Sequence, residues 1–355
     1  MSGTSADGVD VVLADFASGE PRVVGFHTED FPAPLRTELL ALNVASANEL
    51  ERSQLAANQL ADLYAAATNT LLVHCAVAAN DIIAIGCHGQ TVRHRPDLRF
   101  TLQLNNPARL TERTGITVVA DFRARDIAAG GQGAPMVPAF HDGVFRAPDA
   151  TRVVVNIGGI ANITILEKHR PAWGFDTGPG NCLMDAWIHQ HQRLRFDDRG
   201  AWAAQGQALA RLSGQLQGDS YFQMPPPKST GRDQFNLHWL TEHLSYDERA
   251  VDVQATLLNL TAQSIANDIH RHAQGCTEIL VCGGGAQNIT LLARLAEYLP
   301  EATIAPTDKH GVPAQQVEAL AFAWFAKQCI ERRAVDLTAT TGAAHANVLG
   351  AIYPK

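Results

Sequence analysis

Glycine is of ordinary abundance in this chain, with 28 among 355 residues, but much of it is gathered in four short clusters. Each cluster follows an expected strand or lies in an expected hairpin. A phosphate group needs several backbone N–H groups at close range, and glycine lets the chain turn sharply enough to supply them. One cluster alone is more often a tight turn, but several together favour a nucleotide-binding fold. The clusters are Gly3 with Gly8, Gly130-Gly131-Gly133, Gly158-Gly159 and Gly283-Gly284-Gly285.

The common nucleotide-binding motifs are absent from the sequence. It contains no GxxxxGK[ST] loop, no GxGxxG that opens a helix after a strand, and no GxSxG elbow. These absences disfavour a P-loop kinase, a Rossmann dehydrogenase and an α/β-hydrolase. The remaining possibility is a fold that holds phosphates in β-hairpin loops, for which MSGTSADGVD (1–10) and NIGGIANIT (156–164) are the candidates. VCGGGAQNITLLARL (281–295) has the shape of an adenosine pocket.

The composition limits the class of protein. Apolar residues make up 46% of the chain and the formal net charge is −8, which disfavours a nucleic-acid or anionic-membrane partner. The longest apolar run, ALAFAWFA at 319–326, is too short to cross a bilayer. The six cysteines form no CxxC pair, so a disulfide framework or zinc site is not expected and a cytoplasmic location is.

Short strands alternate with helices, which predicts an α/β protein of two domains. We place the first domain at 1–145, with 341–355 as a candidate addition to it, and the second at 146–340. Prolines between 135 and 148 are expected to interrupt any helix at the boundary. Strands are predicted at 9–16, 23–28, 82–86, 117–120, 152–157, 162–166 and 278–282. Helices are predicted within 47–79 and at 182–192, 202–217, 253–271 and 288–299, with a last helix that starts at Pro313.

Ten segments in order resemble the anhydro-N-acetylmuramic acid kinase family from Met1 to Lys355. They are MSGTSADGVD, CHGQTV, ADFRARDIAAGGQGAP, NIGGIANIT, GFDTGPGN, KSTGRDQFN, DVQATL, VCGGGAQN, EALAFAW and TGAAHANVLGAIYP.

The resemblance implies a two-lobed actin-like ATPase fold, a duplicated ribonuclease H-like architecture with ATP in a cleft between the lobes. It also implies ATP and Mg²⁺ as cofactors, a homodimer, and a cytoplasmic role in peptidoglycan recycling. In the implied reaction, ATP phosphorylates O6 of 1,6-anhydro-N-acetylmuramic acid while water opens the anhydro bridge at C1. The product is N-acetylmuramic acid 6-phosphate. Another small-molecule kinase of this fold, a simple ATPase, and an actin-like structural protein are the alternatives.

The resemblance assigns the glycine-rich segments to ATP. Asp7 and Asp10 are candidates to orient magnesium-bound water, since magnesium prefers carboxylates and retained water; alternatively, Asp10 only closes a turn. The expected ATP-binding residues are Gly3, Thr4, Ser5, Ala6, Asp7, Gly8, Val9, Asp10, Gly158, Gly159, Gly283, Gly284 and Gly285.

Asp176 in GFDTGPGN is the expected catalytic base. It matches the family's base by motif position, and it is a lone carboxylate just past an expected strand that ends at Phe175. Glycines and a proline around it predict a rigid, irregular loop. The alternative is a turn or a cap for the helix that starts at Cys182, which Asn181 can supply instead.

Polar residues past two first-domain strands are expected to bind the sugar. Arginine suits the lactyl carboxylate, while carboxylate and amide groups suit hydroxyls or the acetamide. A surface salt bridge, a structural histidine and a solvated helix-start acid are the alternatives for the individual residues. Lys228 is either a further contact to substrate or phosphate or a surface lysine. The expected substrate-binding residues are His88, Gln90, Arg123, Asp126, Gly131, Gln132 and Glu318.

The sequence departs from the family pattern in three places. Relatives usually carry a strand before the MSGTS loop, whereas this sequence starts at Met1, so we expect an upstream-extended form to be more stable. Ala6 replaces a larger apolar residue. Asn105-Asn106 stands where Gly-Asp is common, which removes a carboxylate near the expected sugar site.

Overall fold

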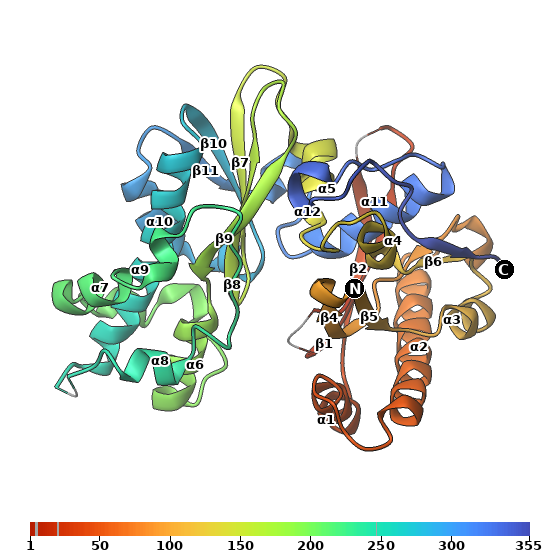
Figure 1. Cartoon of the computed structure of the whole chain (residues 1–355), viewed down its shortest axis with the longest axis horizontal. Coiled ribbons are helices and arrows are strands. Elements are labelled where there is room, and N and C mark those ends of the chain that lie inside the picture. Colours follow the sequence, from red (N-terminus) through yellow and green to blue (C-terminus); the bar gives the residue numbers. More distant parts are fainter. Residues whose placement is uncertain (4–5, 20, 246) are drawn as a thin grey trace. The chain divides into compact units, whose positions relative to one another are not determined.

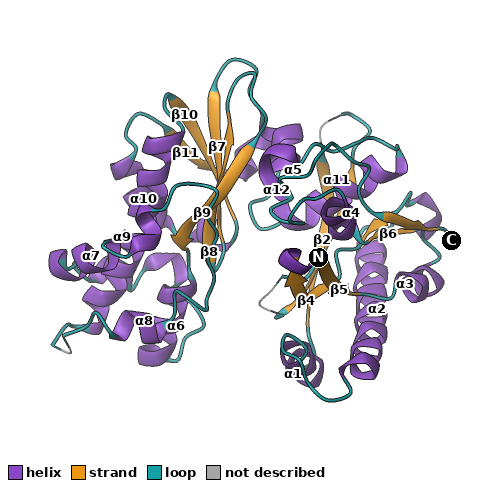
Figure 2. Cartoon of the chain, viewed as in Figure 1, coloured by secondary structure: helices purple, strands orange, loops and turns teal. Residues whose placement is uncertain are grey.

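The computed structural model describes residues 1–3, 6–19, 21–245 and 247–355, which form two compact units (Figure 1). Residues 1–140 and 316–355 form the first unit, and residues 141–315 form the second. These limits differ from the predicted domain boundaries at 145 and 340. Residues 316–340 join the first unit because α11 (Val317–Ile330) packs against β1 (Gly8–Asp15) and β3 (Ile85–Gly86). Both units mix helices and strands (Figure 2), which confirms the α/β class.

The described residues of the first unit form three small sheets. As predicted, β1 and β2 (Arg22–Asp30) form an antiparallel hairpin. The second sheet has the order β12-β6-β3, in which β12 (Ala351–Tyr353) runs antiparallel to β6 (Val118–Ala120) and β3 runs parallel to it. The third sheet is a hairpin of β4 (Gln90–Arg95) and β5 (Phe100–Leu104), neither of which was predicted from the sequence.

One long helix supplies much of the first unit's core. Helix α2 (Glu49–His74) buries an apolar stripe that includes Leu60, Ala61 and Tyr64. The described strands β1 and β3 do not pair with each other, and a mostly apolar groove of about 610 Å³ is lined by β1, α2, β3 and α11. Asp10, at the end of the expected phosphate loop, is among the residues that line this groove.

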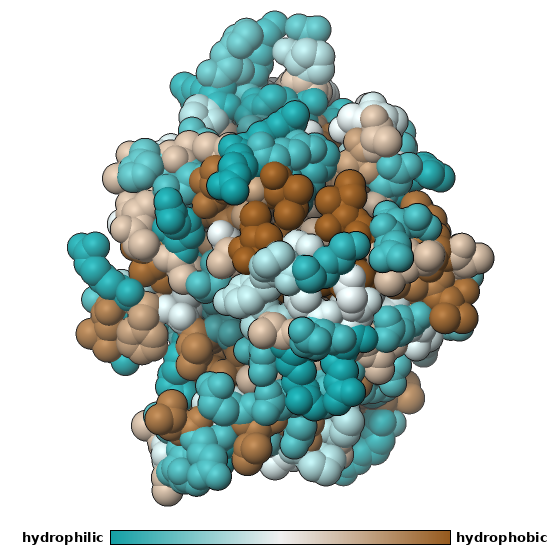
Figure 3. Space-filling view, turned by 90° about the vertical axis from the view of Figure 1, so that its right-hand side faces the viewer, coloured by the Kyte–Doolittle hydropathy of each residue, from teal (hydrophilic) through white to brown (hydrophobic). Residues whose placement is uncertain are grey.

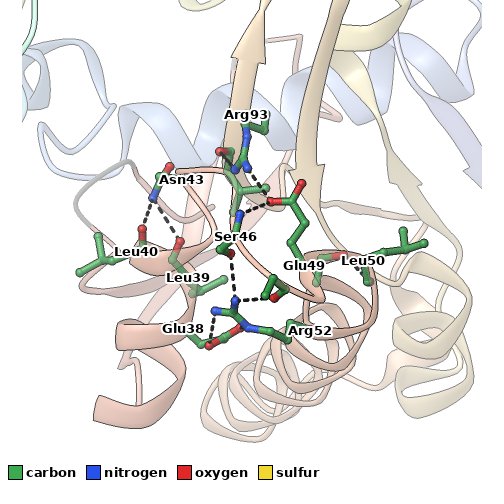
Figure 4. A network of polar contacts seen from close by, with 12 residues as sticks. Glu38, Leu39, Leu40, Asn43, Ser46, Glu49, Leu50, Arg52 and Arg93 are labelled. Atoms are coloured by element: carbon green, nitrogen blue, oxygen red, sulfur yellow. Dashed lines mark hydrogen bonds and ion pairs between the residues drawn. The ribbon is translucent and has the colours of Figure 1, made fainter.

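A polar network fixes the turn between α1 (Ala33–Ala41) and α2 (Figure 4). Arg52 donates to both carboxylate oxygens of Glu38, at 2.7 and 3.0 Å, and to Ser46. Glu49 accepts from the Ser46 N–H and from Arg93 on β4. The network therefore ties α2 to the strand that begins at the candidate sugar residue Gln90.

The second unit is built on one five-stranded sheet with the order β11-β10-β7-β8-β9. The first three strands in the chain form an antiparallel meander, and the last two run parallel to β7. This order is that of a ribonuclease H-like fold. The strands are β7 (Thr151–Ile157), β8 (Ile160–Leu166), β9 (Trp173–Pro179), β10 (Cys276–Cys282) and β11 (Thr303–Pro306).

Helices cover this sheet, and three of them lie close to their predicted positions. They are α6 (Cys182–Gln192), α9 (Ala250–His272) and α10 (Ile289–Tyr298). The side chains of Val153, Val154 and Val155 on the central strand are fully buried. The remaining α-helices among the described residues are α3 (Pro107–Thr114), α4 (Phe122–Ala128), α5 (Val137–Phe145), α7 (Ala210–Gln217), α8 (Leu237–Thr241) and α12 (Thr338–Thr341).

Several predicted elements were wrong in extent. The helix expected at 202–217 exists only as α7, because Gly206 approaches the Val251 carbonyl closely and the chain before it forms short 3-10 turns. The helix that was predicted to start at Pro313 is α11, which begins at Val317. Prolines did not prevent a helix at the predicted boundary, since Pro138 lies in the first turn of α5, where no intrahelical donor is lost.

None of the helices in the described part of the chain combines the length and apolar character that crossing a bilayer requires. On the face of the molecule drawn in Figure 3, apolar side chains form several groups that are separated by hydrophilic side chains. Within the described residues, no disulfide joins any of the six cysteines.

Candidate functional site

The amino-terminal loop is anchored from both sides in the first unit. The Ser2 hydroxyl lies 3.0 Å from the Tyr64 hydroxyl and donates to the Gly89 carbonyl, and Gln90 Nε2 donates to the Gly3 carbonyl at 3.1 Å. Ala6 is buried with a φ of 50°, and Val9 packs into the core, so Val9 can offer a ligand only its backbone. The expected ATP contacts Thr4 and Ser5 lie outside the described residues.

The two carboxylates expected near magnesium differ in their suitability. Asp7 is ion-paired with Arg36 at 2.8 Å and faces solvent, so it does not fit a direct ligand. Asp10 lies in β1, accepts from Thr28 through Oδ1 at 2.9 Å, and interacts electrostatically with Glu318. Within the described residues, no three His, Cys, Asp or Glu side chains gather as a metal site. The set therefore fits a magnesium ion held largely by water and phosphate oxygens, with Asp10 as its carboxylate.

His88 and Arg123 form one unit with a fixed geometry. The Arg123 Nε–H donates to His88 Nε2 at 2.9 Å, and His88 Nδ1 donates to the Gly89 carbonyl at 2.7 Å. Burial and the charge of Arg123 hold the pKa of His88 well below its ordinary value, so His88 is neutral. Arg123 also donates to the Gly133 carbonyl at 2.7 Å. His88 thus orients the guanidinium, and the remaining N–H groups of Arg123 are available to an anion.

Asp126 is buried beneath the Gly131–Gly133 loop. Its Oδ2 accepts from the Gly133 N–H at 2.7 Å and its Oδ1 from the Thr341 hydroxyl at 2.8 Å. A Cβ at Gly131 would lie 2.3 Å from Asp126 Oδ2, so only glycine fits there. Both carboxylate oxygens have protein donors, and Asp126 shapes the loop. The same loop presents Gln132 to solvent while its N–H donates to the Thr341 carbonyl.

At the ends of the β4–β5 hairpin, two buried amide oxygens have no hydrogen-bond partner among the residues that the structure describes. They are Gln90 Oε1 and Asn105 Oδ1. A buried acceptor without a donor is uncommon and points to an absent ligand or water. Asn106 has a different role: its Oδ1 accepts from the Arg109 N–H and caps α3. The Asn-Asn pair therefore supplies one helix cap and one acceptor without a partner.

Glu318 lies in the first turn of α11, with an exposed side chain. It interacts electrostatically with Arg123, whose pKa burial lowers to about 10 and whose charge Glu318 and Asp126 favour. The structure thus brings together His88, Arg123, Asp126 and Glu318 within the first unit.

In the second unit, two glycine segments lie at the carboxyl ends of two neighbouring inner strands of the sheet. Gly158-Gly159 follows β7, Gly283-Gly284-Gly285 follows β10, and these strands are parallel neighbours. Ligands of α/β proteins bind at such carboxyl ends. A Cβ at Gly285 would lie 2.4 Å from the Ile157 side chain, whereas one at Gly284 has open space except for Asn181 Nδ2 at 3.8 Å. Gly285 therefore serves packing, whereas the space beside Gly284 is open.

Two charged residues near the first of these turns were missed from the sequence. A Cβ at Gly159 would lie 3.0 Å from Arg232 Nη2, so the guanidinium covers this turn. Asp185, in the first turn of α6, has its pKa raised to about 6 by burial, while Arg232 opposes the shift. The sequence signal for Arg232 is its position in KSTGRDQFN, the same segment that contains Lys228.

Asp176 lies within β9, not on a loop past the strand as predicted. The strand continues because β8 pairs through Asn162↔Asp176, beside an irregularity in the register. Asp176 Oδ2 accepts from the Thr230 N–H at 3.1 Å. Burial raises the pKa of Asp176 to about 6, while the Thr230 hydrogen bond and the Lys228 charge lower it. Such a carboxyl is ionised at neutral pH and is a stronger base than an exposed aspartate.

Comparison with known proteins matches the whole chain to one family. The family profile for anhydro-N-acetylmuramic acid kinase covers residues 1–355. The curated protein of that name from Bordetella pertussis is 55% identical, over all of this chain and 94% of its own length. The proteins of that name from Cupriavidus metallidurans and Variovorax paradoxus are 50% and 51% identical, over all of this chain and 96% and 97% of their own lengths.

A solved structure of a ROK family glucokinase from Streptomyces griseus, in complex with glucose and AMPPNP, also matches. It is 13% identical with a TM-score of 0.40, over 90% of this chain and 99% of the glucokinase. A match this weak bears on neither substrate nor site.

Proposed function

The chain belongs to the anhydro-N-acetylmuramic acid kinase family, and from this membership we propose how its residues carry out the reaction. The protein is an ATP-dependent kinase of cell-wall recycling. Water adds to C1 of 1,6-anhydro-N-acetylmuramic acid, the C1–O6 bond breaks, and O6 takes the γ-phosphoryl group of ATP. ADP leaves as the bond between the β- and γ-phosphates breaks. The product carries one phosphate and one water more than the sugar substrate.

Asp176 is the general base, and its environment is the observation that carries the proposal. Its carboxylate takes a proton from the water that attacks C1. The Thr230 N–H at 3.1 Å fixes one carboxylate oxygen, which leaves the other oriented for the water. A pKa of about 6 keeps the group ionised at neutral pH and gives it more proton affinity than a solvated aspartate has.

In the second unit, ATP is assigned to the glycine turns at the ends of β7 and β10. Gly158, Gly159 and the Arg232 guanidinium suit phosphate oxygens, and Gly283 to Gly285 suit the adenosine. In the first unit, Gly3 to Asp10 are assigned to phosphates. Asp10 would hold a magnesium-bound water; the ion supplies charge neutralisation at the phosphates when bound.

In the first unit, the sugar is assigned to the group around Arg123. The guanidinium, oriented by His88, suits the lactyl carboxylate. Gln90 Oε1 and Asn105 Oδ1 are acceptors for hydroxyl or acetamide N–H groups. Gln132 and Glu318 are exposed side chains suited to the remaining hydroxyls, and Asp126 with Gly131 sets the shape of the loop.

A cytoplasmic location and a homodimer complete the proposal. The absence of disulfides among the described residues is compatible with a reducing compartment. Light scattering after gel filtration measures the dimer directly; a monomeric mass contradicts this part alone.

The test is ATP turnover with and without 1,6-anhydro-N-acetylmuramic acid, with the product mass recorded. We expect turnover to require the sugar and the product to gain both phosphate and water. Asp176→Asn is expected to lower kcat by about 10²- to 10⁴-fold, the contribution usual for a general base. Turnover that ignores the sugar would favour a simple ATPase, and filaments formed with ATP would favour an actin-like structural protein.

A further inference from the structure

The second unit contains a fully buried ion pair, and one of its members, Lys228, is hydrogen-bonded through its backbone to the candidate base Asp176. The side chains of Lys228 and Asp268 are 0% and 4% exposed, and Lys228 Nζ lies 3.0 Å from Asp268 Oδ2. Lys228 is therefore not a surface residue, which was one of the two alternatives for its role. Asp268 lies on α9, 40 residues farther along the chain, so no local pattern announces the pair.

The ammonium group of Lys228 is enclosed by the residues that hold Asp176. It lies 5.0 Å from the ring centroid of Tyr221 and 5.5 Å from that of Phe175. Phe175 precedes Asp176 in β9. The Tyr221 hydroxyl donates to the Asp176 carbonyl at 2.7 Å, and the Asp176 N–H donates to the Lys228 carbonyl at 3.2 Å. The backbone of the base and the buried ammonium are thus parts of one small assembly.

Packing alone does not explain a charged pair at this place. Replacing a buried ion pair by apolar side chains of similar volume is often neutral or stabilising, because both charges have lost their hydration. The aromatic walls of this site would suit a methionine or leucine equally well. A charge next to the base has an effect that no apolar side chain supplies: it favours the ionised carboxyl.

We propose that Lys228, held in place by Asp268, is a positioning residue that fixes Asp176 on β9 and keeps its carboxyl ionised. This proposal rests on the proposed function, in which Asp176 is the base. Lys228 opposes the effect of burial on Asp176. Because the Asp268 carboxylate lies 3.0 Å from the same ammonium, its negative charge offsets part of the Lys228 field at Asp176. The pair therefore sets the proton affinity of the base between that of a solvated and that of an isolated buried carboxyl.

The titratable and charged groups around Asp176 come from three elements. Lys228 belongs to the segment that follows the 3-10 turn Ser220–Gln223, and Tyr221 belongs to that turn. Asp268, Arg271 and His272 belong to α9; Arg271 lies 3.8 Å from Asp268 Oδ1, and the His272 ring packs against Phe175. Thr230 contributes an uncharged N–H.

Opposite shifts of the pH–rate profile test the proposal. Lys228→Met removes the cation, so the acid limb of kcat is expected to move to higher pH by about one unit, as for loss of a nearby opposite charge. Asp268→Asn leaves the cation without its partner, so the acid limb is expected to move to lower pH. The high-pH plateau of kcat should stay within about a factor of ten of wild type, since Asp176 remains.

A partly buried pair elsewhere in the same unit serves as the control. Arg152 on β7 pairs with Glu278 on β10, with side chains 12% and 20% exposed. Arg152→Met is expected to lower Tm and to leave the acid limb in place. If both Lys228→Met and Asp268→Asn leave the limb unmoved, or move it in the same direction, the positioning role is wrong.

A direct titration separates this inference from the proposed function. Carboxyl ¹³C NMR of aspartate-labelled protein, with Asp176 assigned by its loss in Asp176→Asn, reports the ionisation of that group without turnover. Opposite shifts of its midpoint support the pair's role even if Asp176→Asn proves active, which would overturn only the catalytic assignment. If Lys228→Met does not fold, Asp268→Asn decides: an unchanged or raised Asp176 midpoint overturns the inference.

Discussion

At the scale of single residues, Asp176 combines a useful proton affinity with a cost in stability. Its pKa is about 6 in the folded protein and near 3.8 in an exposed aspartate. Since the folded state binds this proton more tightly, the folded protein is at a disadvantage wherever the group is ionised. The disadvantage is absent below about pH 4, develops between pH 4 and pH 6, and is complete above pH 6.

Asp176→Asn is therefore expected to stabilise the protein above pH 6 while it abolishes most activity. The asparagine carbonyl can still accept from the Thr230 N–H, and no charge is buried. After a discount for partial exposure, the expected gain is about 1–2 kcal/mol at pH 8. It should shrink to nothing near pH 4. Thermal unfolding followed at both pH values measures this.

Asp247→Asn, at an exposed position, is the matched control and should change Tm little at either pH. A gain for Asp176→Asn that is as large at pH 4 as at pH 8 would mean that burial of the charge is not its cause.

At the scale of elements, two adjacent glycines after β10 have different roles: Gly285 is required for packing, and Gly284 is proposed to contact ATP. Gly285→Ala drives a Cβ against Ile157, and because that residue ends the central strand β7, we expect a loss of about 1–3 kcal/mol. Gly284→Ala has room and should leave Tm nearly unchanged. If ATP approaches Gly284 as proposed, this variant should raise the KM for ATP. The two variants together require unfolding curves and ATP kinetics; equal effects on stability would contradict the geometry.

The support of the Gly131–Gly133 loop by α12 gives a second prediction for elements. Thr341→Val leaves Asp126 Oδ1 buried without its donor, which costs about 1–3 kcal/mol and loosens the loop. We expect the KM for the sugar to rise and the KM for ATP to stay. Thr340→Val, on the same helix but with its hydroxyl bonded only to the Leu337 carbonyl, is the control. An unchanged KM for the sugar in Thr341→Val would separate this loop from the substrate.

Local patterns predicted some elements well and left others invisible. Regular apolar spacing identified α6, α9 and α10, and β-branched runs identified β7 and β8. The strand that is β9 was predicted to end at Phe175, because the glycines and proline after it are typical of a loop. Pairing with β8 extends it to Pro179.

The candidate site was predictable where a motif carries the chemistry, and not where distant segments meet. Asp176 and the glycine turns were found from their motifs. The burial of Lys228 depends on Asp268, and the role of Asp126 depends on Thr341, which is 215 residues away. The sequence around each of these residues is compatible with an exposed side chain, so only tertiary structure distinguishes the two cases.

At the scale of the whole molecule, one unit is continuous in the chain and the other is not. Residues 141–315 form the second unit alone, whereas the first needs both 1–140 and 316–355. A fragment of residues 137–315, which keeps α5 intact, contains every strand of the five-stranded sheet. We expect it to unfold cooperatively by itself, as seen by circular dichroism during heating.

Residues 1–140 alone should not unfold cooperatively, because β6 then lacks β12 and the sheets lack α11. A cooperative transition for 1–140 would contradict the role given to the carboxyl-terminal segment.

The divided first unit also has a consequence for biosynthesis. The ribosome releases residues 1–140 first, but their last partners, α11 and β12, leave it only after the entire second unit has been made. At elongation rates of about 5–20 residues per second, this interval is roughly 10–35 s. During that time the faces of β1 and β3 that α11 covers, and the edge of β6 that pairs with β12, have no cover, while the second unit can already fold. The nascent amino-terminal segment is thus the part of this protein that most needs a chaperone, and slow codons within 141–315 would lengthen its exposure.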